Sequence, residues 1–214
     1  MMLKELFLNA LYPKDAACCA CNKEAVLDSR GLCKKCAELI LPAPGFSLGE
    51  PVEAAAAGML YNDPAADMIH RFKYYNCRYL GKNLASFITL PVEWKADVII
   101  PVPLHPARLK ERGYNQSLII AGALAERSDI PVRNDLLKRI RYTLMHSMTS
   151  REERHANVKD AFRASKRCGG ANVILVDDVI TSGSTAEECA RALKAAGAAK
   201  VYVIAACYAG GQER

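Results

Sequence analysis

VILVDDVITSGST, residues 173–185, contains the three parts of a ligand-binding turn in an α/β sheet. Four apolar residues, Val173–Val176, form a short run that is typical of a buried parallel strand. Asp177 and Asp178 follow this run, and the hydroxyl-rich turn Thr181–Thr185 leads into a helix. Because open parallel sheets bind ligands at the carboxyl ends of their strands, we expect the binding site here.

Each residue type in this turn has a chemical use. A helix N-terminus presents free N–H groups and the positive end of the helix dipole, which suits a phosphate group. Gly183 lets the backbone approach a ligand closely. Further donors come from the hydroxyls of Thr181, Ser182, Ser184 and Thr185. The two adjacent carboxylates suit sugar hydroxyls or a magnesium ion. The alternative is an ordinary turn whose carboxylates are solvated.

The sequence around this turn predicts an α/β protein. A helix is expected over Ser184–Ala196, with Ser184 and Glu187 as a capping box and Gly197 after its end, and a strand is expected over residues 199–209. The expected upstream elements are, in order, a strand at 52–61, a helix at 63–74 capped by Asp63, a helix at 79–89, a strand at 96–104, a polar loop at 105–114, a helix at 115–128 capped by Asn115, and a loop with a short helix within 136–163. Strands and helices that alternate through short connections predict an open, mostly parallel sheet flanked by helices.

Two CxxC pairs lie near the N-terminus: Cys18, Cys21, Cys33 and Cys36. Two such turns can bring four thiolates together in a tetrahedron, so the spacing predicts a structural zinc site. Cys19 leaves the first ligand open, although Cys18 gives the usual two-residue spacing. Free or redox-active thiols and an iron–sulfur cluster are the alternatives.

We expect the cysteine-rich segment to form a module of its own. A short amphipathic helix is predicted over residues 2–11. LPAPGFSLGEP, residues 41–51, holds three Pro and two Gly, which is typical of a linker. The predicted organisation is an N-terminal module over residues 1–45 and a second domain over residues 46–214.

The charge is unevenly distributed. The net charge is +6, and residues 103–167 hold fourteen Lys/Arg against seven Asp/Glu. This excess favours an anionic partner, either a polyphosphate or a nucleic acid. Nine cysteines without a recognisable export signal favour a metal site plus free thiols over a disulfide framework. No apolar run is long enough for membrane insertion, and the expected location is cytoplasmic.

Several segments resemble a known family. Residues 173–185 resemble the motif with which type I phosphoribosyltransferases bind 5-phosphoribosyl 1-pyrophosphate (PRPP). Residues 97–116, DVIIPVPLHPARLKERGYNQ, are similar to the pyrophosphate-side segment of the ComF family, which joins a four-cysteine zinc module to a phosphoribosyltransferase domain. Residues 70–85 and 143–162 extend the resemblance over nearly the whole chain, and His146 departs from it where Gln would be expected.

The resemblance implies a type I phosphoribosyltransferase-like fold with a small zinc-ribbon-like N-terminal module. It implies that Asp177 and Asp178 hold the ribose 2- and 3-hydroxyls of PRPP, that Thr181–Thr185 hold its 5-phosphate, and that Mg²⁺ accompanies it. The candidate charge partners of the pyrophosphate are Arg108, Lys110 and Arg112. The alternative for these three cations is a solvated face.

Two classes of function follow from these patterns. The first is an enzyme that transfers the phosphoribosyl group of Mg-PRPP to an acceptor with loss of pyrophosphate. The second is a binding module without turnover, which binds a nucleotide or single-stranded DNA, or docks proteins of the competence machinery, since the ComF family is associated with DNA uptake. Tyr74, Tyr75 and Tyr79 lie among basic residues and could stack on bases, cover a nucleobase or pack in the protein. No residue stands out as the activator of a nucleophile, so the sequence supports binding better than catalysis.

Overall fold

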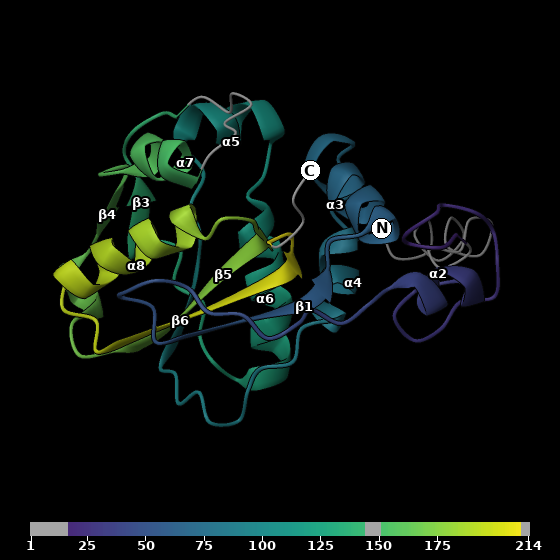
Figure 1. Ribbon diagram of the computed structural model, residues 1–214, viewed down its shortest axis with the longest axis horizontal. Helices are drawn as coiled ribbons and strands as arrows, with labels where there is room; N and C mark the ends of the chain where they lie inside the picture. The colour runs from purple at the N-terminus through teal and green to yellow at the C-terminus, as the bar shows by residue number, and fades with distance from the viewer. Residues whose placement is uncertain (1–16, 144–150, 211–214) are drawn as a thin grey trace, which may run out of the picture.

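The computed structural model describes residues 17–143 and 151–210 (Figure 1). The helix expected at 2–11 and the departure at His146 lie outside these residues. The elements are α2 (Lys34–Leu39), β1 (Ala54–Leu60), α3 (Asp63–Tyr74), α4 (Leu80–Ser86), β2 (Val98–Pro101), α5 (Pro106–Arg112), α6 (Gln116–Ser128), β3 (Leu137–Arg139), α7 (Arg151–Val158), β4 (Phe162–Ala164), the 3₁₀ turn η1 (Lys166–Cys168), β5 (Asn172–Ile180), α8 (Ser184–Ala195) and β6 (Lys200–Tyr208).

A parallel sheet forms the centre of the molecule. Its strands lie in the order β1-β6-β5-β2, and every neighbouring pair is parallel. The connection from β5 through α8 to β6 is the parallel crossover that the sequence predicts. All four strands therefore end at the same edge of the sheet, which brings the end of β5 close to the segments that follow β1 and β2. The predicted fold class, an open parallel sheet flanked by helices, is confirmed.

Helices cover both faces of the sheet because β5 and β6 are apolar on both sides. Val173 and Leu175 pack in one core with α8, whereas Ile174 and Val176 pack in a second core with α3, α4 and α6. All four side chains are at most 1% exposed. Burying each of them stabilises the fold by about 1.5–3 kcal/mol, which fixes β5 firmly beneath the residues at its end.

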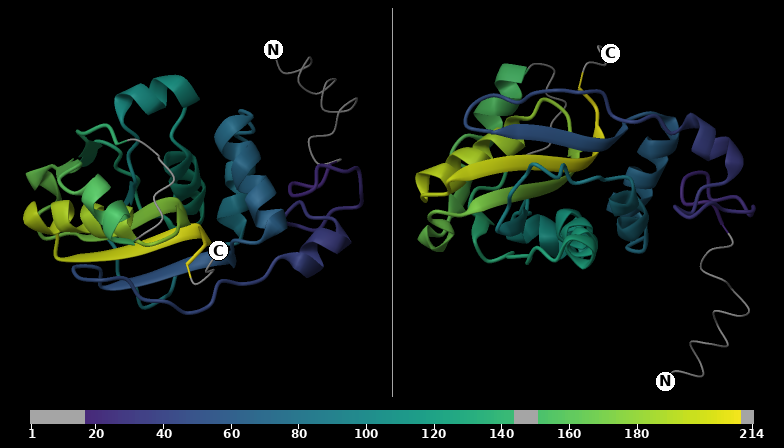
Figure 2. Two further views of the ribbon diagram at one scale, coloured as in Figure 1. Left: turned by 45° about the horizontal axis from the view of Figure 1, so that its top comes forward. Right: turned by 90° about the horizontal axis from the view of Figure 1, so that it is seen from below.

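The cysteine-rich segment packs into the second of these cores. Cys18, Cys19 and Leu32 are buried in the same cluster as Phe72 of α3 and Leu84 of α4. Figure 2 shows this segment and α2 at one end of the molecule, beside α3 and α4 and far from α8. The segment is thus attached to the sheet through two helices.

The structure corrects three local predictions. The polar loop expected at 105–114 is instead largely helix α5, which His105 caps by accepting a hydrogen bond from Ala107 N. Asp63 is the first residue of α3 and Asn62 is its N-cap, without a side-chain capping bond. Gly183 is the N-cap of α8, so Ser184 is inside the helix and forms no capping box. Polarity misled the first prediction, because α5 is a surface helix without buried residues.

Sequence analysis also missed a small antiparallel pair at residues 137–139 and 162–164. β3 and β4 pair there, with Arg139 opposite Phe162, and α7 lies between them in the sequence. Strands of three residues have too little periodicity to be recognised from sequence.

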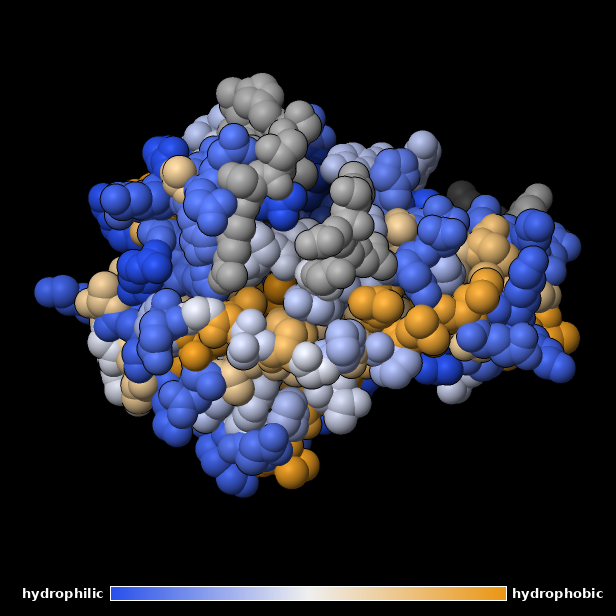
Figure 3. All heavy atoms as spheres, in the orientation of Figure 1, coloured by the Kyte–Doolittle hydropathy of each residue, from blue (hydrophilic) through white to orange (hydrophobic). Residues whose placement is uncertain are grey.

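The surface is mostly hydrophilic in the view of Figure 3, with apolar residues gathered in a band across its middle. Exposed apolar side chains include Leu39 and Leu41, each 48% exposed, which adjoin the cysteine-rich segment. Within residues 17–143 and 151–210, no helix is sufficiently long and apolar to span a membrane.

Two helical glycines provide a matched test of the packing between α4 and α6. A Cβ on Gly81 would lie 2.4 Å from Cγ2 of Ile119, whereas a Cβ on Gly122 would meet nothing within 4 Å. We expect Gly81→Ala to lower the free energy of unfolding by about 1–3 kcal/mol, since the helices must separate. Gly122→Ala should raise it by up to about 1 kcal/mol through helix propensity alone. Urea denaturation of both variants measures the difference, and equal effects would contradict the packing.

Candidate functional site

Asp177 and Asp178 lie near the carboxyl end of β5, one of the two central strands. The backbone N–H of Asp178 donates to Oδ1 of Asp177 at 2.8 Å, and Oγ of Ser117, at the start of α6, donates to the same oxygen at 3.0 Å. The Asp178 side chain is only 10% exposed. Asp177 is half-buried, so two neighbouring carboxylates with limited access to water require a nearby cation, because burying an uncompensated charge is costly.

Lys73, near the end of α3, supplies that cation. Its Nζ lies 3.0 Å from Oδ1 of Asp178, and its side chain is 21% exposed. Burial alone would lower the pKa of Lys73, but the adjacent Asp178 carboxylate outweighs burial and raises this pKa above its ordinary value. Burial and the neighbouring Asp178 charge raise the pKa of Asp177 to about 7. The pair therefore contains one firmly ion-paired carboxylate and one that ionises near neutral pH.

The turn after β5 leads directly to the N-terminus of α8. Gly183 has a φ of 82°, in the left-handed region, and a Cβ there would lie 2.5 Å from Cδ2 of Leu48. Glycine is therefore required both by the backbone and by the available space. The hydroxyls of Ser182 and Ser184 lie 2.8 Å apart beside this helix start, and Thr181 is exposed. Hydroxyl donors thus gather at a helix N-terminus, as an anionic ligand requires.

Glu187 does not cap α8, because its carboxylate contacts groups of other segments. It is 3% exposed, and its Oε1 accepts a hydrogen bond from Gly49 N at 2.8 Å. Its Oε2 lies 3.1 Å from Nε2 of His155 on α7. One buried carboxylate therefore connects α8, α7 and the segment that precedes β1.

The three predicted pyrophosphate-side cations all lie on α5. Since each residue turns a helix by about 100°, Arg108 and Arg112 share one face while Lys110 is turned away from them. Arg108 Nη2 donates to the carbonyl of Thr143 at 3.2 Å, and the Arg112 guanidinium lies 5.3 Å from the ring centre of Tyr74. Lys110 is exposed. The structure brings Arg108 and Arg112 to one side of α5 but does not bring Lys110 with them.

Arg139, the last residue of β3, is a further cation near the acid pair. It donates to Oγ1 of Thr143, and its guanidinium lies 5.3 Å from the ring centre of Phe162. Burial lowers its pKa, and both the Asp177 carboxylate and Arg108 act on its charge. Within the described part of the chain, its buried Nε has no hydrogen-bond partner. Arg139 therefore brings a desolvated donor close to both the acid pair and α5.

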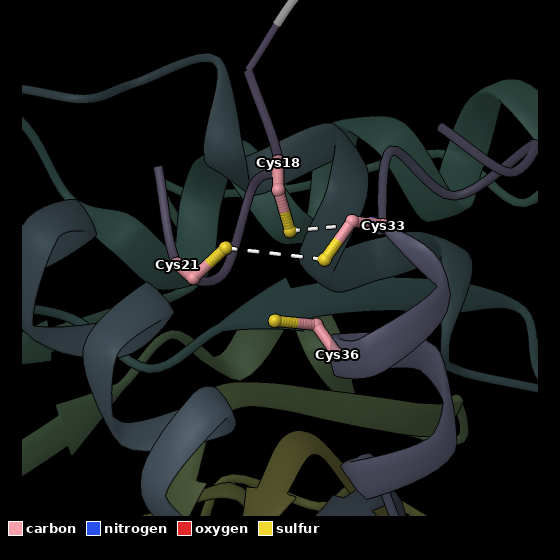
Figure 4. Close-up of side chains that lie close together, drawn as sticks. All are labelled: Cys18, Cys21, Cys33 and Cys36. Atoms are coloured by element: carbon pink, nitrogen blue, oxygen red, sulfur yellow. Dashed lines mark hydrogen bonds between the residues drawn. The ribbon is translucent and has the colours of Figure 1, made fainter. Parts of the chain in front are cut away.

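The four CxxC cysteines form a second, separate cluster (Figure 4). The sulfur atoms of Cys18, Cys21, Cys33 and Cys36 all lie within 4.8 Å of one another. The sulfurs of Cys21 and Cys33 are 3.9 Å apart. A tetrahedral zinc ion with bonds of about 2.3 Å places its sulfur ligands about 3.8 Å apart, so the four side chains fit such an ion. The cluster could hold a metal such as zinc.

The structure also distinguishes between Cys18 and Cys19 as the candidate metal ligand. The backbone N–H of Cys33 donates to the Cys18 sulfur at 3.3 Å. Burial opposes ionisation of Cys18, but this hydrogen bond and others to its sulfur outweigh burial and lower its pKa to about 7. Burial raises the pKa of Cys19 to about 12, and its thiol points to the carbonyl of Arg30 at 3.6 Å. The Cys18 sulfur lies within 4.8 Å of the sulfurs of Cys21, Cys33 and Cys36, whereas the Cys19 thiol is directed to the Arg30 carbonyl, so Cys18 is the ligand that the geometry favours.

Arg71 attaches the cysteine cluster to α3. Its guanidinium donates to the carbonyls of Cys19 and Ala20 at 3.1 and 3.3 Å, and to Oδ1 of Asn22 at 2.9 Å. Arg71 and Lys73 therefore connect the same helix to the two candidate sites.

Sequence analysis missed three polar residues at the acid pair: Lys73, Ser117 and Arg139. Lys73 had a detectable signal, because it lies four residues after Ile69, on the apolar side of α3, where a charge needs a buried partner. Ser117 and Arg139 gave no comparable signal, since only the packing of α6 and of the β3–β4 pair brings them to β5.

Comparison with known proteins agrees with this architecture. Residues 114–214 match the family model described as "Phosphoribosyl transferase domain". "Competence protein F" of Haemophilus influenzae is 34% identical over 154 residues, 67% of each chain. "DNA utilization protein YhgH" of Escherichia coli O6:H1 is 30% identical over 206 residues, 89% of each chain, and "Competence protein ComFC" of Bacillus subtilis is 28% identical over 62% of this chain and 55% of its own.

Among solved structures, the glutamine PRPP amidotransferase of B. subtilis aligns at 27% identity and a TM-score of 0.39, over 64% of this chain and 27% of its own. The family assignment rests on the sequence relatives and not on this weaker alignment. With its phosphoribosyltransferase domain and its N-terminal four-cysteine cluster, this chain belongs to the competence protein F (ComF) family.

Proposed function

We propose that the chain binds PRPP with Mg²⁺ at the end of β5, at a site whose chemistry would suit transfer of the phosphoribosyl group to an acceptor with loss of pyrophosphate. The observation that carries this proposal is a carboxylate pair, with Asp178 buried and Asp177 half-buried, followed closely by a hydroxyl-rich turn and a helix N-terminus. No other cluster in the described part of the chain combines these three features.

The ribose hydroxyls of the ligand would contact hydrogen-bond acceptors, and its 5-phosphate would contact donors. Asp177 and Asp178 would accept hydrogen bonds from the ribose 2- and 3-hydroxyls, since ionised carboxylates are pure acceptors. The 5-phosphate would lie at Thr181–Thr185, where hydroxyls and backbone N–H groups donate. Phosphate and carboxylates repel each other, so this polarity would fix the direction in which the sugar lies.

The pyrophosphate would face the cations of α5. Arg108 and Arg112 share the face toward Tyr74 and Thr143, which favours them over Lys110 as its charge partners. As the bond to the anomeric carbon breaks, negative charge grows on the pyrophosphate, and fixed cations stabilise it most at that moment. A Mg²⁺ ion bound with PRPP would neutralise a further part of that charge.

The cysteine cluster would hold a structural zinc ion. Four thiolates complete a tetrahedral shell without an open position for substrate. Because Cys18 and Cys36 are buried in the core shared with α3 and α4, the ion would stabilise the helix that carries Lys73.

A second candidate function is binding of single-stranded DNA. Relatives carry the names competence protein and DNA utilization protein. Tyr74, Tyr75 and Tyr79 are 57%, 66% and 52% exposed, so they do not pack in the core. The Arg112 guanidinium lies beside the Tyr74 ring, and Arg71 donates a hydrogen bond to the Tyr79 hydroxyl, so these rings lie among cations on a surface where bases could stack.

Calorimetric titration with PRPP, with and without Mg²⁺, tests the proposed function. We expect saturable binding with Mg²⁺. The double substitution Asp177→Asn with Asp178→Asn should weaken it by at least about 100-fold, because two charge-assisted hydrogen bonds are lost.

Two α5 variants test the role of charge in this titration, and Lys110→Met is the matched control for Arg112→Met. Arg112→Met should weaken binding by at least about tenfold, and Lys110→Met should leave it nearly unchanged. No binding of wild-type protein at millimolar PRPP would overturn the proposal. If salt-sensitive binding of single-stranded DNA were found instead, the second candidate would take its place.

The acid pair also predicts a pH dependence of stability that needs no ligand. The pKa of Asp177 is raised in the folded state, so its favourable contribution is complete below pH 4 and is lost as the pH rises toward 7. Asp177→Asn mimics the protonated form. The variant should therefore gain at least about 1 kcal/mol in unfolding free energy over wild type between pH 5 and pH 8. Urea denaturation at both pH values measures this gain, and a constant difference would contradict it.

Zinc analysis of purified protein tests the cysteine cluster. Wild-type protein should contain about one zinc ion per chain. Cys36→Ser should lose the ion and lower Tm by at least about 5 °C, because metal binding contributes to folding. Cys19→Ser is the control, since it removes a neighbouring buried thiol outside the cluster and should retain zinc. Loss of zinc from Cys19→Ser alone would reassign the ligand.

A further inference from the structure

Lys73 is the cation in contact with the acid pair. Its ammonium lies 3.0 Å from Oδ1 of Asp178, and it also acts on the charge of Asp177. Adjacent carboxylates with little solvent around them are attractive to Mg²⁺ or Mn²⁺, which take oxygen ligands. A lysine ammonium in contact with the same carboxylate repels a divalent cation strongly, because screening by water is weak at this depth.

The position of Lys73 is set by a rigid helix. Four residues of α3, namely Ala65, Met68, Ile69 and Phe72, are buried, and Arg71 fastens the same turn to the cysteine cluster. The groups that face Lys73 from other elements are Asp177 and Asp178 of β5, Cys207 of β6 and Arg112 of α5. The two carboxylates are the anions among these groups that hold its ammonium.

We propose that Lys73 is the resident cation of the acid pair, and that it prevents Asp177 and Asp178 from binding a divalent cation while no ligand is present. Divalent cation then reaches the site only with a phosphoribosyl ligand, whose hydroxyls compete with Lys73 for Asp178. This second step rests on the proposed function, whereas the first concerns the ligand-free protein alone.

The first step can be tested with Mn²⁺ alone, measured by electron paramagnetic resonance on zinc-saturated protein. Wild type should bind no more Mn²⁺ than the Asp177→Asn, Asp178→Asn double variant. Lys73→Met should gain one site at least about tenfold tighter than any in wild type, and adding Asp178→Asn should abolish it.

Three further variants keep this test decisive. Lys73→Arg retains the cation and should bind Mn²⁺ as wild type does. Lys73→Gln removes the charge with a polar side chain, and it replaces Lys73→Met if the latter fails to fold by circular dichroism. Lys82→Met is the matched control, because Lys82 forms an exposed ion pair with Glu126, and it should gain no site. Tight Mn²⁺ binding to wild type at the acid pair, or no gain in either neutral variant, would overturn the proposal.

A PRPP titration separates this inference from the proposed function. If wild type binds PRPP, Lys73→Met should acquire Mn²⁺ before the ligand, whereas wild type should acquire it only with the ligand. Ligand-independent Mn²⁺ uptake by wild type would contradict the inference. If wild type binds no PRPP, the proposed function fails, and the Mn²⁺ measurement without ligand still decides the role of Lys73.

Discussion

The ion pair between Lys73 and Asp178 is the contact around which the candidate site is organised. Near its end β5 carries two carboxylates, of which Asp178 is buried and Asp177 is half-buried, and burial of that charge is tolerated only with a cation in contact. α3 supplies the cation, α6 adds the Ser117 hydroxyl, and the β3–β4 pair brings Arg139 near. Elements far apart in the sequence are thus held together by one electrostatic requirement at one edge of the sheet.

The helix α3 joins this site to the cysteine cluster. Arg71 donates to carbonyls of the cysteine-rich segment, and Lys73, two residues later, contacts Asp178. The buried cysteines also share an apolar core with Phe72 of the same helix. A metal ion at the cluster would therefore stabilise the platform that positions the cation of the acid pair. This arrangement gives the N-terminal cysteines a structural consequence for the proposed ligand site, although the two clusters are separate.

Much of this structure could be predicted from sequence, and what could not has physical reasons. The β5 run, its two aspartates, the glycine turn and the long helices have strong local patterns, and the CxxC spacing marked the cysteine cluster. α5 was missed because it buries no residue and has no apolar stripe. β3 and β4 are too short for a period, so the approach of Arg139 was invisible. The capping box at Ser184 failed because Gly183 is the N-cap of α8, and Glu187 contacts Gly49 and His155, which only the tertiary fold brings near.

A crystal structure of the wild-type protein with PRPP and Mg²⁺ would test the central claim most directly. The account predicts that the ribose hydroxyls lie within hydrogen-bond distance of Asp177 and Asp178, with the 5-phosphate at the N-terminus of α8. It also predicts that the ligand changes the contact between Lys73 and Asp178. A ligand bound elsewhere, or a sugar turned away from the two aspartates with that ion pair intact, would contradict it.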